Sequence, residues 1–404
     1  MRRLITALVF SFAFASLILL AGCALDRSSN TTPTSGTNTP SAGSNTPAAP
    51  PAGGSSGSGS GGSGSGGGAS ASEHLIYALE NQNQVFVYDA HPAQGTIQPV
   101  AGPIATTLVN GASIAFDAPQ HVLFSVGFTC QPRGDCGKNV AVLSTANPQS
   151  PTLVNTQQFD DIDAMLIDNS GLLPIGVNPV NAFTSFRYDP AAHSLSDVGF
   201  AQFQGGNAPS TFIHPNQQIV IGVTASGAAS GPFTTYVTTF HRDLSTGALT
   251  KSATLTLAGD TGDAALTLDG RYLLVPNTEN GAVYIVAVDG STGNLTLAGT
   301  SANAGAFLLY RFLDATHVIG RLKVNNSDKL TVFTFNSGSM TVTAGSTLAL
   351  SGELFSARNV GNTIYAGETN AIQMIIFDPS NGSLRLAGSV GAVAPSIDVN
   401  PITP

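Results

Sequence analysis

Charge is scarce in this sequence, and its basic residues form no cluster outside the N-terminus. Asp, Glu, Lys and Arg make up 10% of the 404 residues, and the formal net charge is −9. A protein that binds nucleic acid needs clustered Lys and Arg to neutralise phosphates. The only two consecutive Lys or Arg residues, Arg2 and Arg3, precede an apolar run and fit a targeting signal. The charge pattern therefore argues against a nucleic-acid partner.

Motifs of common cofactor and hydrolase sites are also missing. The sequence has no Trp, no Cys-x-x-Cys-His haem motif, no phosphate loop and no His-Glu-x-x-His zinc motif. No Gly-x-Ser-x-Gly nucleophile motif occurs after residue 72. Electron transfer through a quinone or haem therefore has little support, and we expect no cofactor and no resident metal ion.

Only three cysteines are present, and the first follows the apolar run Leu4–Leu20. The run ends in Leu-Ala-Gly-Cys23, which resembles the bacterial lipobox, where small residues precede a cysteine that is lipidated and becomes the new N-terminus. An ordinary N-terminal membrane anchor and a cleaved signal with an incidental cysteine are the alternatives. We expect residues 1–23 to be a lipoprotein signal peptide, with Cys23 as the lipid attachment site.

The next 49 residues, 24–72, consist almost entirely of Ser, Gly, Thr, Pro, Ala and Asn. Such a segment cannot bury a core, so we expect a disordered tether with a reach of about 40 Å. Ala24 occupies the position where an Asp resembles an inner-membrane retention mark in Gram-negative bacteria. We therefore expect a lipid-anchored protein of the bacterial cell envelope, on the periplasmic or surface face of the outer membrane.

The other two cysteines, Cys130 and Cys136, lie in a Gly- and Pro-containing loop. In an exported chain, such an even pair predicts a disulfide that fixes one local loop shape. A zinc site is the alternative, but it needs four ligands, or three and a water, and no further Cys or His lies nearby in the sequence.

An internal repeat organises residues 73–404. Short β-rich runs alternate with polar turns, as in Leu75–Asp89, Tyr272–Val286 and Ile364–Asp378, and no 3.6-residue periodicity is present. The last residues of the second runs align at intervals of 55, 45, 52, 48, 47 and 42. These residues are Tyr88, Leu143, Tyr188, Phe240, Val288, Phe335 and Phe377.

Seven units with a period near 48 residues indicate an all-β, seven-bladed β-propeller with four antiparallel strands per blade. A six- or eight-bladed ring and a β-sandwich array are the alternatives. The first unit starts at His74 with no room for an innermost strand, whereas the C-terminal segment 394–401 resembles the segment 208–215 that precedes another unit. We expect this C-terminal strand to complete the first blade and close the ring.

The segment Leu266–Asn277 resembles the strand pair of the lactonase-type propellers, also called the YVTN repeat group, which include 6-phosphogluconolactonases and carboxymuconate cyclases. The resemblance covers about residues 74–404. It implies charged groups at one mouth of the central channel, where residues just before strand one and just after strand two of each blade meet.

This sequence departs from the pattern that the resemblance implies. Gly262-Asp263 stands where the enzymes have Arg-His, Asn277-Thr278 where they have Asn-Glu, and Pro209-Ser210 where they have Pro-His. Only Asn277 is kept, as a channel-mouth binding residue. The missing groups are those that proton transfer and oxyanion stabilisation would need.

Glu80 and Glu368 occupy the slot equivalent to Asn277 in neighbouring units. Together with Asp263 and Arg358 they are the candidate catalytic residues, although a strand-end Glu is usually a solvated side chain. Asp160, Asp161 and Asp163 form an acidic group, but they lack the spacing of a calcium loop.

Two functional hypotheses follow from these observations. The first is a monomeric binding or interaction module without an intact lactonase site, whose partner is an envelope protein, a glycan or a small molecule. The alternative is a hydrolase or isomerase that opens a lactone-like metabolite at the channel mouth. Membrane association would occur through the N-terminal lipid in either case.

Overall fold

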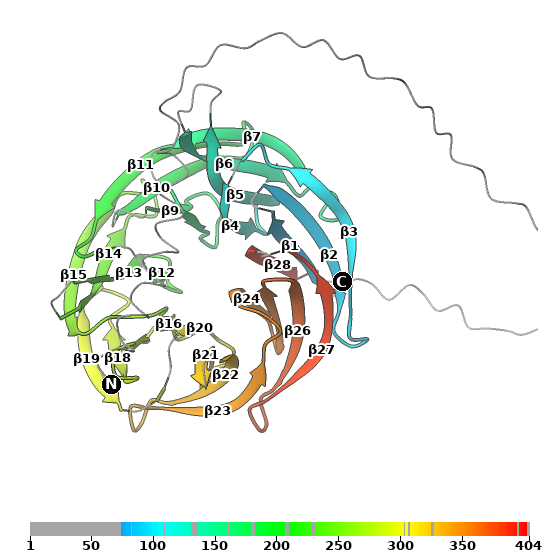
Figure 1. Cartoon of the computed structure of the whole chain (residues 1–404). Coiled ribbons are helices and arrows are strands. Elements are labelled where there is room, and N and C mark those ends of the chain that lie inside the picture. The colour runs from blue at the N-terminus through cyan, green and yellow to red at the C-terminus, as the bar shows by residue number, and fades with distance from the viewer. Residues whose placement is uncertain are drawn as a thin grey trace, which may run out of the picture. The chain divides into compact units, whose positions relative to one another are not determined.

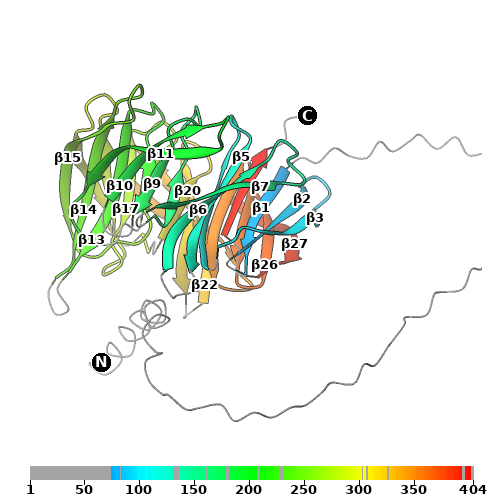
Figure 2. The ribbon, with the colours of Figure 1, turned by 90° about the horizontal axis from the view of Figure 1, so that it is seen from above.

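Each of the seven repeat units forms one four-stranded antiparallel sheet, and the sheets stand around a central axis as the blades of a propeller (Figures 1 and 2). The computed structural model describes residues 74–81, 83–108, 110–130, 136–159, 162–178, 182–206, 210–227, 232–302, 304–305, 308–324, 327–393 and 396–401. The signal segment, Cys23 and the tether lie outside the described residues. In the described part, no helix is long and apolar enough to cross a membrane.

Within each blade we call the strands innermost, second, third and outermost, counting outward from the axis, and we number the blades so that blade 1 contains the C-terminal strand. The innermost strands of blades 1 to 7 are β28 (Ser396–Pro401), β4 (Asn110–Asp117), β8 (Ala164–Leu166), β12 (Ser210–Ile213), β16 (Ala265–Leu266), β20 (Leu308–Phe312) and β24 (Leu354–Val360). The second strands are β1 (His74–Glu80), β5 (Val122–Cys130), β9 (Ile175–Asn178), β13 (Ile219–Ser226), β17 (Tyr272–Pro276), β21 (His317–Val324) and β25 (Thr363–Glu368).

The outer half of each blade repeats the same order. The third strands are β2 (Gln84–His91), β6 (Cys136–Ser144), β10 (Ala182–Asp189), β14 (Thr234–Arg242), β18 (Val283–Val288), β22 (Ser327–Asn336) and β26 (Ala371–Asp378). The outermost strands are β3 (Thr96–Ala105), β7 (Thr152–Phe159), β11 (Ser194–Gln202), β15 (Leu249–Ala258), β19 (Leu295–Ser301), β23 (Thr341–Ala349) and β27 (Ser383–Gly391).

The expected blade count is confirmed, and all seven aligned residues, from Tyr88 to Phe377, lie on third strands. In every blade the pairing of the third strand with the outermost strand contains a register shift. A β-bulge increases the local right-handed twist of a strand pair. The repeated bulge therefore increases the twist of each blade between its third and its outermost strand.

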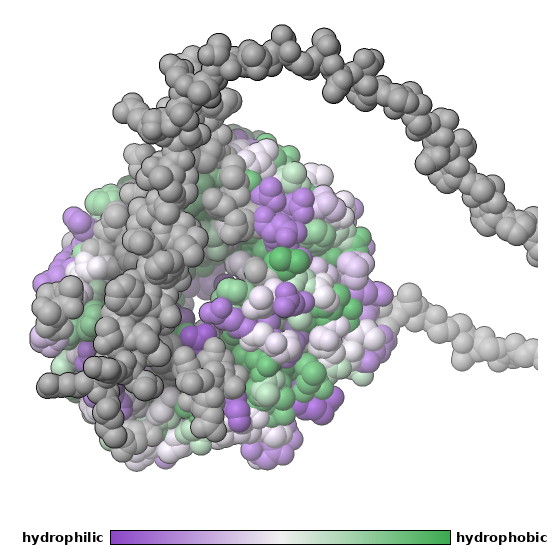
Figure 3. All heavy atoms as spheres, viewed as in Figure 1, coloured by the Kyte–Doolittle hydropathy of each residue, from purple (hydrophilic) through white to green (hydrophobic). Residues whose placement is uncertain are grey.

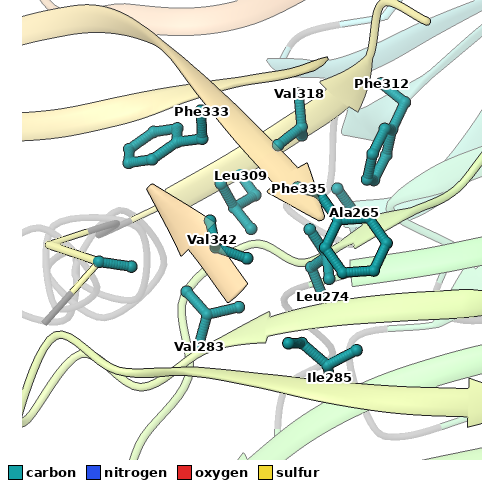
Figure 4. Close-up of a cluster of buried hydrophobic side chains, with 11 residues drawn as sticks. Ala265, Leu274, Val283, Ile285, Leu309, Phe312, Val318, Phe333, Phe335 and Val342 are labelled. Atoms are coloured by element: carbon teal, nitrogen blue, oxygen red, sulfur yellow. The ribbon is translucent and has the colours of Figure 1, made fainter. Parts of the chain in front are cut away.

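Blades are held together by apolar side chains on facing sheets. Figure 4 shows one such cluster between blades 5 and 6, in which Ala265, Leu274 and Ile285 pack against Phe312 and Phe335. All five are at most 2% exposed. Because each blade packs against a neighbour on both faces, its third strand carries apolar residues at recurring positions such as Phe240, Phe335 and Phe377, which explains the repeat signal.

The ring closes as the sequence predicts. β28 pairs antiparallel with β1, from Ser396 opposite Leu79 to Pro401 opposite His74. In Figure 1 the C-terminal strand accordingly lies beside the first strand of the chain. This pairing supplies blade 1 with its innermost strand and leaves that edge of β1 covered.

Candidate functional site

One end of the central channel is built from equivalent points of successive blades. Second strands end where innermost strands begin, as the pairings of Glu368 with Leu354 and of Leu79 with Ser396 show. We call this end of the channel the upper mouth. Glu80 and Glu368 are the last residues of β1 and β25, and Asn277 directly follows β17. The structure therefore places all three at the upper mouth, in equivalent positions.

Glu80 binds the segment that leads into the innermost strand of its own blade. Its Oε2 accepts a hydrogen bond from the backbone N–H of Val393 at 2.9 Å. Its Oε1 accepts a short hydrogen bond from the hydroxyl of Tyr88. Burial, followed by the hydrogen bond to Glu80, raises the pKa of Tyr88, so the phenol remains a neutral donor. The Glu80 carboxylate thus connects β1, β2 and the residues before β28.

Glu368 makes the matching connection in blade 7. Its Oε2 accepts hydrogen bonds from the Ser351 hydroxyl at 2.5 Å and from the Gly352 N–H at 2.8 Å, both in the segment before β24. Gln373 of β26 donates to the same Ser351 hydroxyl at 3.0 Å. Glu368 is fully buried and Glu80 is 4% exposed, so the expectation that they are solvated is wrong. Each carboxylate holds a backbone segment in place.

Asn277 repeats the arrangement with an amide. Its Nδ2 donates to the carbonyl of Ala258, the last residue of β15 in blade 4, at 3.0 Å, and to the Tyr284 hydroxyl at 3.2 Å. Its Oδ1 accepts from the Glu279 N–H at 2.9 Å. Asn277 is 2% exposed. The three equivalent side chains therefore share one structural task, which is to fasten the connection into the innermost strand of each blade.

Asp263 differs from this group because it precedes an innermost strand, β16. Its carbonyl accepts a hydrogen bond from the Leu309 N–H at 2.8 Å, which links blades 5 and 6. Burial raises the pKa of the Asp263 carboxyl to about 6, and the guanidinium of Arg321 limits this rise. A carboxyl with a pKa in this range can both release and accept a proton near neutral pH.

Arg358 lies on the channel wall, in the middle of β24. Its Nε is 3.3 Å from Oδ1 of Asp398 on β28, and one of its Nη atoms donates to the Ala357 carbonyl at 3.0 Å. The other oxygen of Asp398 accepts from the Phe116 N–H of β4 at 2.8 Å. The pair therefore connects the innermost strands of blades 7, 1 and 2.

The channel contains a cavity of about 530 Å³ to which all seven innermost strands contribute. Its apolar lining includes Phe116, Met165, Phe212 and Ile213, and its charged lining residues are Arg311, Arg358 and Asp398. Figure 3 shows the middle of the ring hollowed on the face that is drawn. A cavity of this size, whose lining combines apolar side chains with a few charged groups, is typical of small-molecule sites.

Arg311 is the channel residue that the sequence did not single out. It lies on β20, is exposed to the channel, and makes no hydrogen bond or ion pair with the described residues. Its side chain faces the open channel, but the surrounding blades shield it from bulk water and so lower the pKa of Arg311; the positive charge of Arg358 lowers it further, and Asp398 opposes both effects. Its only sequence signal is a lone charge in the β-rich run Leu308–Phe312.

Only one residue of the acidic group of the sequence, Asp163, lies in the described part. Asp163 is bonded to Nζ of Lys138 at 2.5 Å, while Asp160 and Asp161 lie outside the described part. No group of three or more His, Cys, Asp or Glu side chains in the described part could hold a metal ion. Ser210, which replaces the family His, accepts a hydrogen bond from the Ala264 N–H at 2.7 Å and connects blades 4 and 5.

The cysteine pair lies where β5 ends and β6 begins. Cys130 and Cys136 are paired Cα partners there, but their side chains lie outside the described part. Directly opposed residues of antiparallel strands have Cα atoms about 4.5–5.5 Å apart, within the disulfide range. The disulfide stays a prediction.

Comparison with solved structures identifies the fold. A candidate 6-phosphogluconolactonase from Bacteroides fragilis superposes with a TM-score of 0.66 at 14% identity, covering 82% of this chain and 99% of that chain. A similar protein from Bacteroides uniformis gives 0.66 at 12% identity, covering 81% of this chain and 100% of that chain. The periplasmic gluconolactonase of Pseudomonas aeruginosa gives 0.62 at 16% identity, covering 81% of this chain and 98% of that chain.

Sequence comparison adds no assignment, because no protein-family model and no curated protein matches the chain. Identities below 25% carry the fold and not the chemistry. The resemblance read from Leu266–Asn277 is confirmed at that level: residues 74–401 form a lactonase-like, seven-bladed β-propeller.

Proposed function

We propose that this protein is a binding module of the cell envelope, anchored by a lipid on Cys23 and separated from the membrane by the tether 24–72. In this proposal the propeller binds a small molecule, a glycan or an envelope protein and does not open lactones. The observation that carries the proposal is that Glu80 and Glu368 are buried and hold backbone segments. Three of their four carboxylate oxygens already accept hydrogen bonds from the protein, which supports a structural role over a catalytic one.

The location rests on the N-terminal signal and its Leu-Ala-Gly-Cys23 ending. The similar fold of a periplasmic gluconolactonase is consistent with an exported propeller. Lipidation is tested by labelling cells with radioactive palmitate. The wild-type chain should carry label and sediment with membranes, whereas Cys23→Ser should lose both properties. Cys130→Ser, the matched control, should keep the label.

The absence of lactonase activity is tested on the full-length protein solubilised in detergent. Five- and six-membered sugar lactones, with and without a phosphate, should be consumed no faster than in a heat-denatured sample. A saturable rise in the Tm with a specific ligand class, without turnover, would support the binding module. Turnover at enzyme-like rates would contradict it.

A hydrolase or isomerase is the second candidate, because the Asp263 carboxyl has a pKa raised to about 6 at the upper mouth. If Asp263 is a general base, activity should rise as pH increases through about 6 and should fall at least a hundredfold in Asp263→Asn. Asp269→Asn, at the other end of β16, is the control and should leave activity unchanged. Equal activity in the two variants would eliminate this candidate.

A further inference from the structure

The central channel carries an excess of positive charge within an acidic protein. Arg311 and Arg358 face one carboxylate, Asp398, so the charged residues that line the cavity leave one uncompensated positive charge. The whole chain has a formal net charge of −9. A local positive potential inside a negatively charged protein, enclosed by low-dielectric walls, concentrates anions.

The geometry points to a ligand site at this place: we propose that the channel binds a small monocarboxylate with an apolar body, whose carboxylate is held by Arg311 and Arg358. The inference rests on the proposed binding function and gives it a ligand class. Arg311 and Arg358 project from the adjacent blades 6 and 7 into the same cavity. Neither residue belongs to the upper-mouth positions, because each lies within an innermost strand.

The guanidinium of Arg311 donates to none of the described residues, whereas the guanidinium of Arg358 uses only some of its N–H donors. Arg358 is engaged through Nε with Asp398 and through one Nη with a carbonyl, and its second Nη makes no hydrogen bond to a described residue. A guanidinium offers planar donors that match the two oxygens of a carboxylate. Asp398 orients Arg358 and leaves that remaining Nη to a ligand.

The charge and shape of the cavity select the ligand class. One uncompensated positive charge is neutralised by one negative charge, so a monoanion fits better than a doubly charged phosphate. The lining residues Phe116, Met165 and Phe212, on the innermost strands of blades 2, 3 and 4, supply apolar surface in the same cavity as the cations of blades 6 and 7. A cavity of about 530 Å³ accommodates a small ring or a short alkyl chain beside the carboxylate.

The enclosed position of Arg311 makes a bound anion more favourable. The pKa of Arg311 is lowered first by its enclosure and then by the charge of Arg358, so the charged form of Arg311 is destabilised by its neighbour. A carboxylate placed between them removes this repulsion. Binding should therefore weaken as ionic strength rises.

The experiment uses the full-length protein in detergent, with benzoate and hexanoate as probes and isothermal titration calorimetry as the measurement. Both probes should bind with one site per chain, while benzyl alcohol and inorganic phosphate should bind at least tenfold more weakly. Arg311→Met keeps the side-chain length and removes the charge, and it should raise the Kd for benzoate at least tenfold. Arg385→Met, which removes an exposed Arg on the outermost strand β27, should leave the Kd unchanged.

Several outcomes would overturn the inference. Benzoate binding that is equal in wild type and in folded Arg311→Met would do so, as would phosphate binding as tight as benzoate binding, or no binding of either carboxylate to wild type. If Arg311→Met fails to fold by circular dichroism, Arg311→Gln replaces it, and the comparison of benzoate with benzyl alcohol on wild type remains decisive. Lactone turnover in the same sample would refute the proposed function while leaving a carboxylate site intact.

Discussion

The carboxylate of Glu80 accepts a hydrogen bond from the backbone N–H of Val393 at 2.9 Å, although the two residues are 313 positions apart. The bond joins the end of the first strand to the segment that leads into the last strand. It therefore belongs to the closure of the ring, in addition to the pairing of β28 with β1. Glu80, which the sequence suggests as a catalytic acid at the channel mouth, thus helps to close the ring of blades.

Glu80→Gln should lower the free energy of unfolding by about 1–3 kcal/mol, since an amide has one acceptor oxygen for the two donors, Tyr88 and Val393. Its NH2 group would leave the Val393 N–H unpaired or would turn the Tyr88 hydroxyl into an acceptor, and in either case a hydrogen bond to a charged oxygen is lost. Urea unfolding followed by circular dichroism measures the change. Glu353→Gln, at an exposed site, is the control and should shift stability by less than about 0.5 kcal/mol. Equal midpoints for the two variants would show that the Glu80 bonds contribute nothing.

Asp117 should make the protein less stable as pH rises from about 4 to 6. This fully buried carboxyl ends β4, and burial raises its pKa from 3.8 to about 6, with the nearby charge of Asp168 adding to the rise. A raised carboxyl pKa means that the folded state holds the proton more tightly than the unfolded state. Its stabilising effect is therefore full below about pH 4 and is lost as pH passes through 6.

The Asp117 contribution amounts to about 1–3 kcal/mol, and Asp117→Asn should remove it. Unfolding in urea at pH 4 and at pH 6.5 measures the slope. Asp263, whose pKa is also raised to about 6, has the same sign and accounts for any slope that remains. Asp243→Asn provides the opposite case, because hydrogen bonds from Ser245 lower the pKa of that carboxyl to about 2. A pH slope unchanged by Asp117→Asn would contradict the prediction.

Substitutions at two turn glycines should distinguish the cost of backbone strain from the cost of a steric clash. Gly382 and Gly293 have φ values of +71° and +75° at equivalent points of blades 7 and 5. A Cβ on Gly382 would meet its nearest neighbour, His317, at 3.8 Å, whereas a Cβ on Gly293 would lie 2.8 Å from Ser252. Gly382→Ala should therefore cost about 1–2 kcal/mol, and Gly293→Ala should cost more.

Thermal unfolding of both glycine variants under one set of conditions provides the measurement. Met340 already adopts a φ of +51° at the equivalent turn of blade 6, so the ring tolerates a side chain there. Met340→Gly should lower stability by about 1–2 kcal/mol, since relief of strain and the entropy of the unfolded chain offset each other, while the packing of Met340 against the cluster between blades 5 and 6 is lost. A larger loss for Gly382→Ala than for Gly293→Ala would contradict the steric argument.

Cys130 and Cys136 should form a disulfide when the protein is exported. The strand register places them as direct partners where β5 ends and β6 begins, which suits disulfide geometry. Intact mass under non-reducing conditions should be lower by two hydrogens, and thiol titration should find neither cysteine. Reduction should lower stability by about 2 kcal/mol at most, because the closed loop is short. Two free thiols in exported protein would contradict the prediction.

The sequence was sufficient for the architecture because the signal is local and repeated. Each third strand must be apolar on both faces to pack between two blades, so residues such as Phe240 and Phe377 recur at blade spacing. The role of the C-terminal strand was predictable as well, since the first unit has no innermost strand of its own. The units aligned at Leu143 and Tyr188, whose intervals to their neighbours vary between 45 and 55 residues, form blades of the same strand order as the others.

The functional reading of individual side chains could not be obtained in this way. Glu80 and Glu368 align with Asn277 and were correctly placed at one mouth, but their burial depends on Val393 and Ser351, which other segments bring into contact. Hydrogen bonding to a backbone segment leaves no periodic trace in a sequence. A solvated and a buried carboxylate at the end of a strand therefore have the same sequence pattern.

The chain by itself determined the number of blades, the strand order and the closing strand, because hydrophobic periodicity and turn residues act over a few positions. Tertiary structure alone decided that Arg311, Arg358 and Asp398 share one cavity. They lie on three different innermost strands, and only closure of the ring brings those strands around a common axis. The Coulomb interaction among the three depends on that distance in space, which local sequence pattern does not encode.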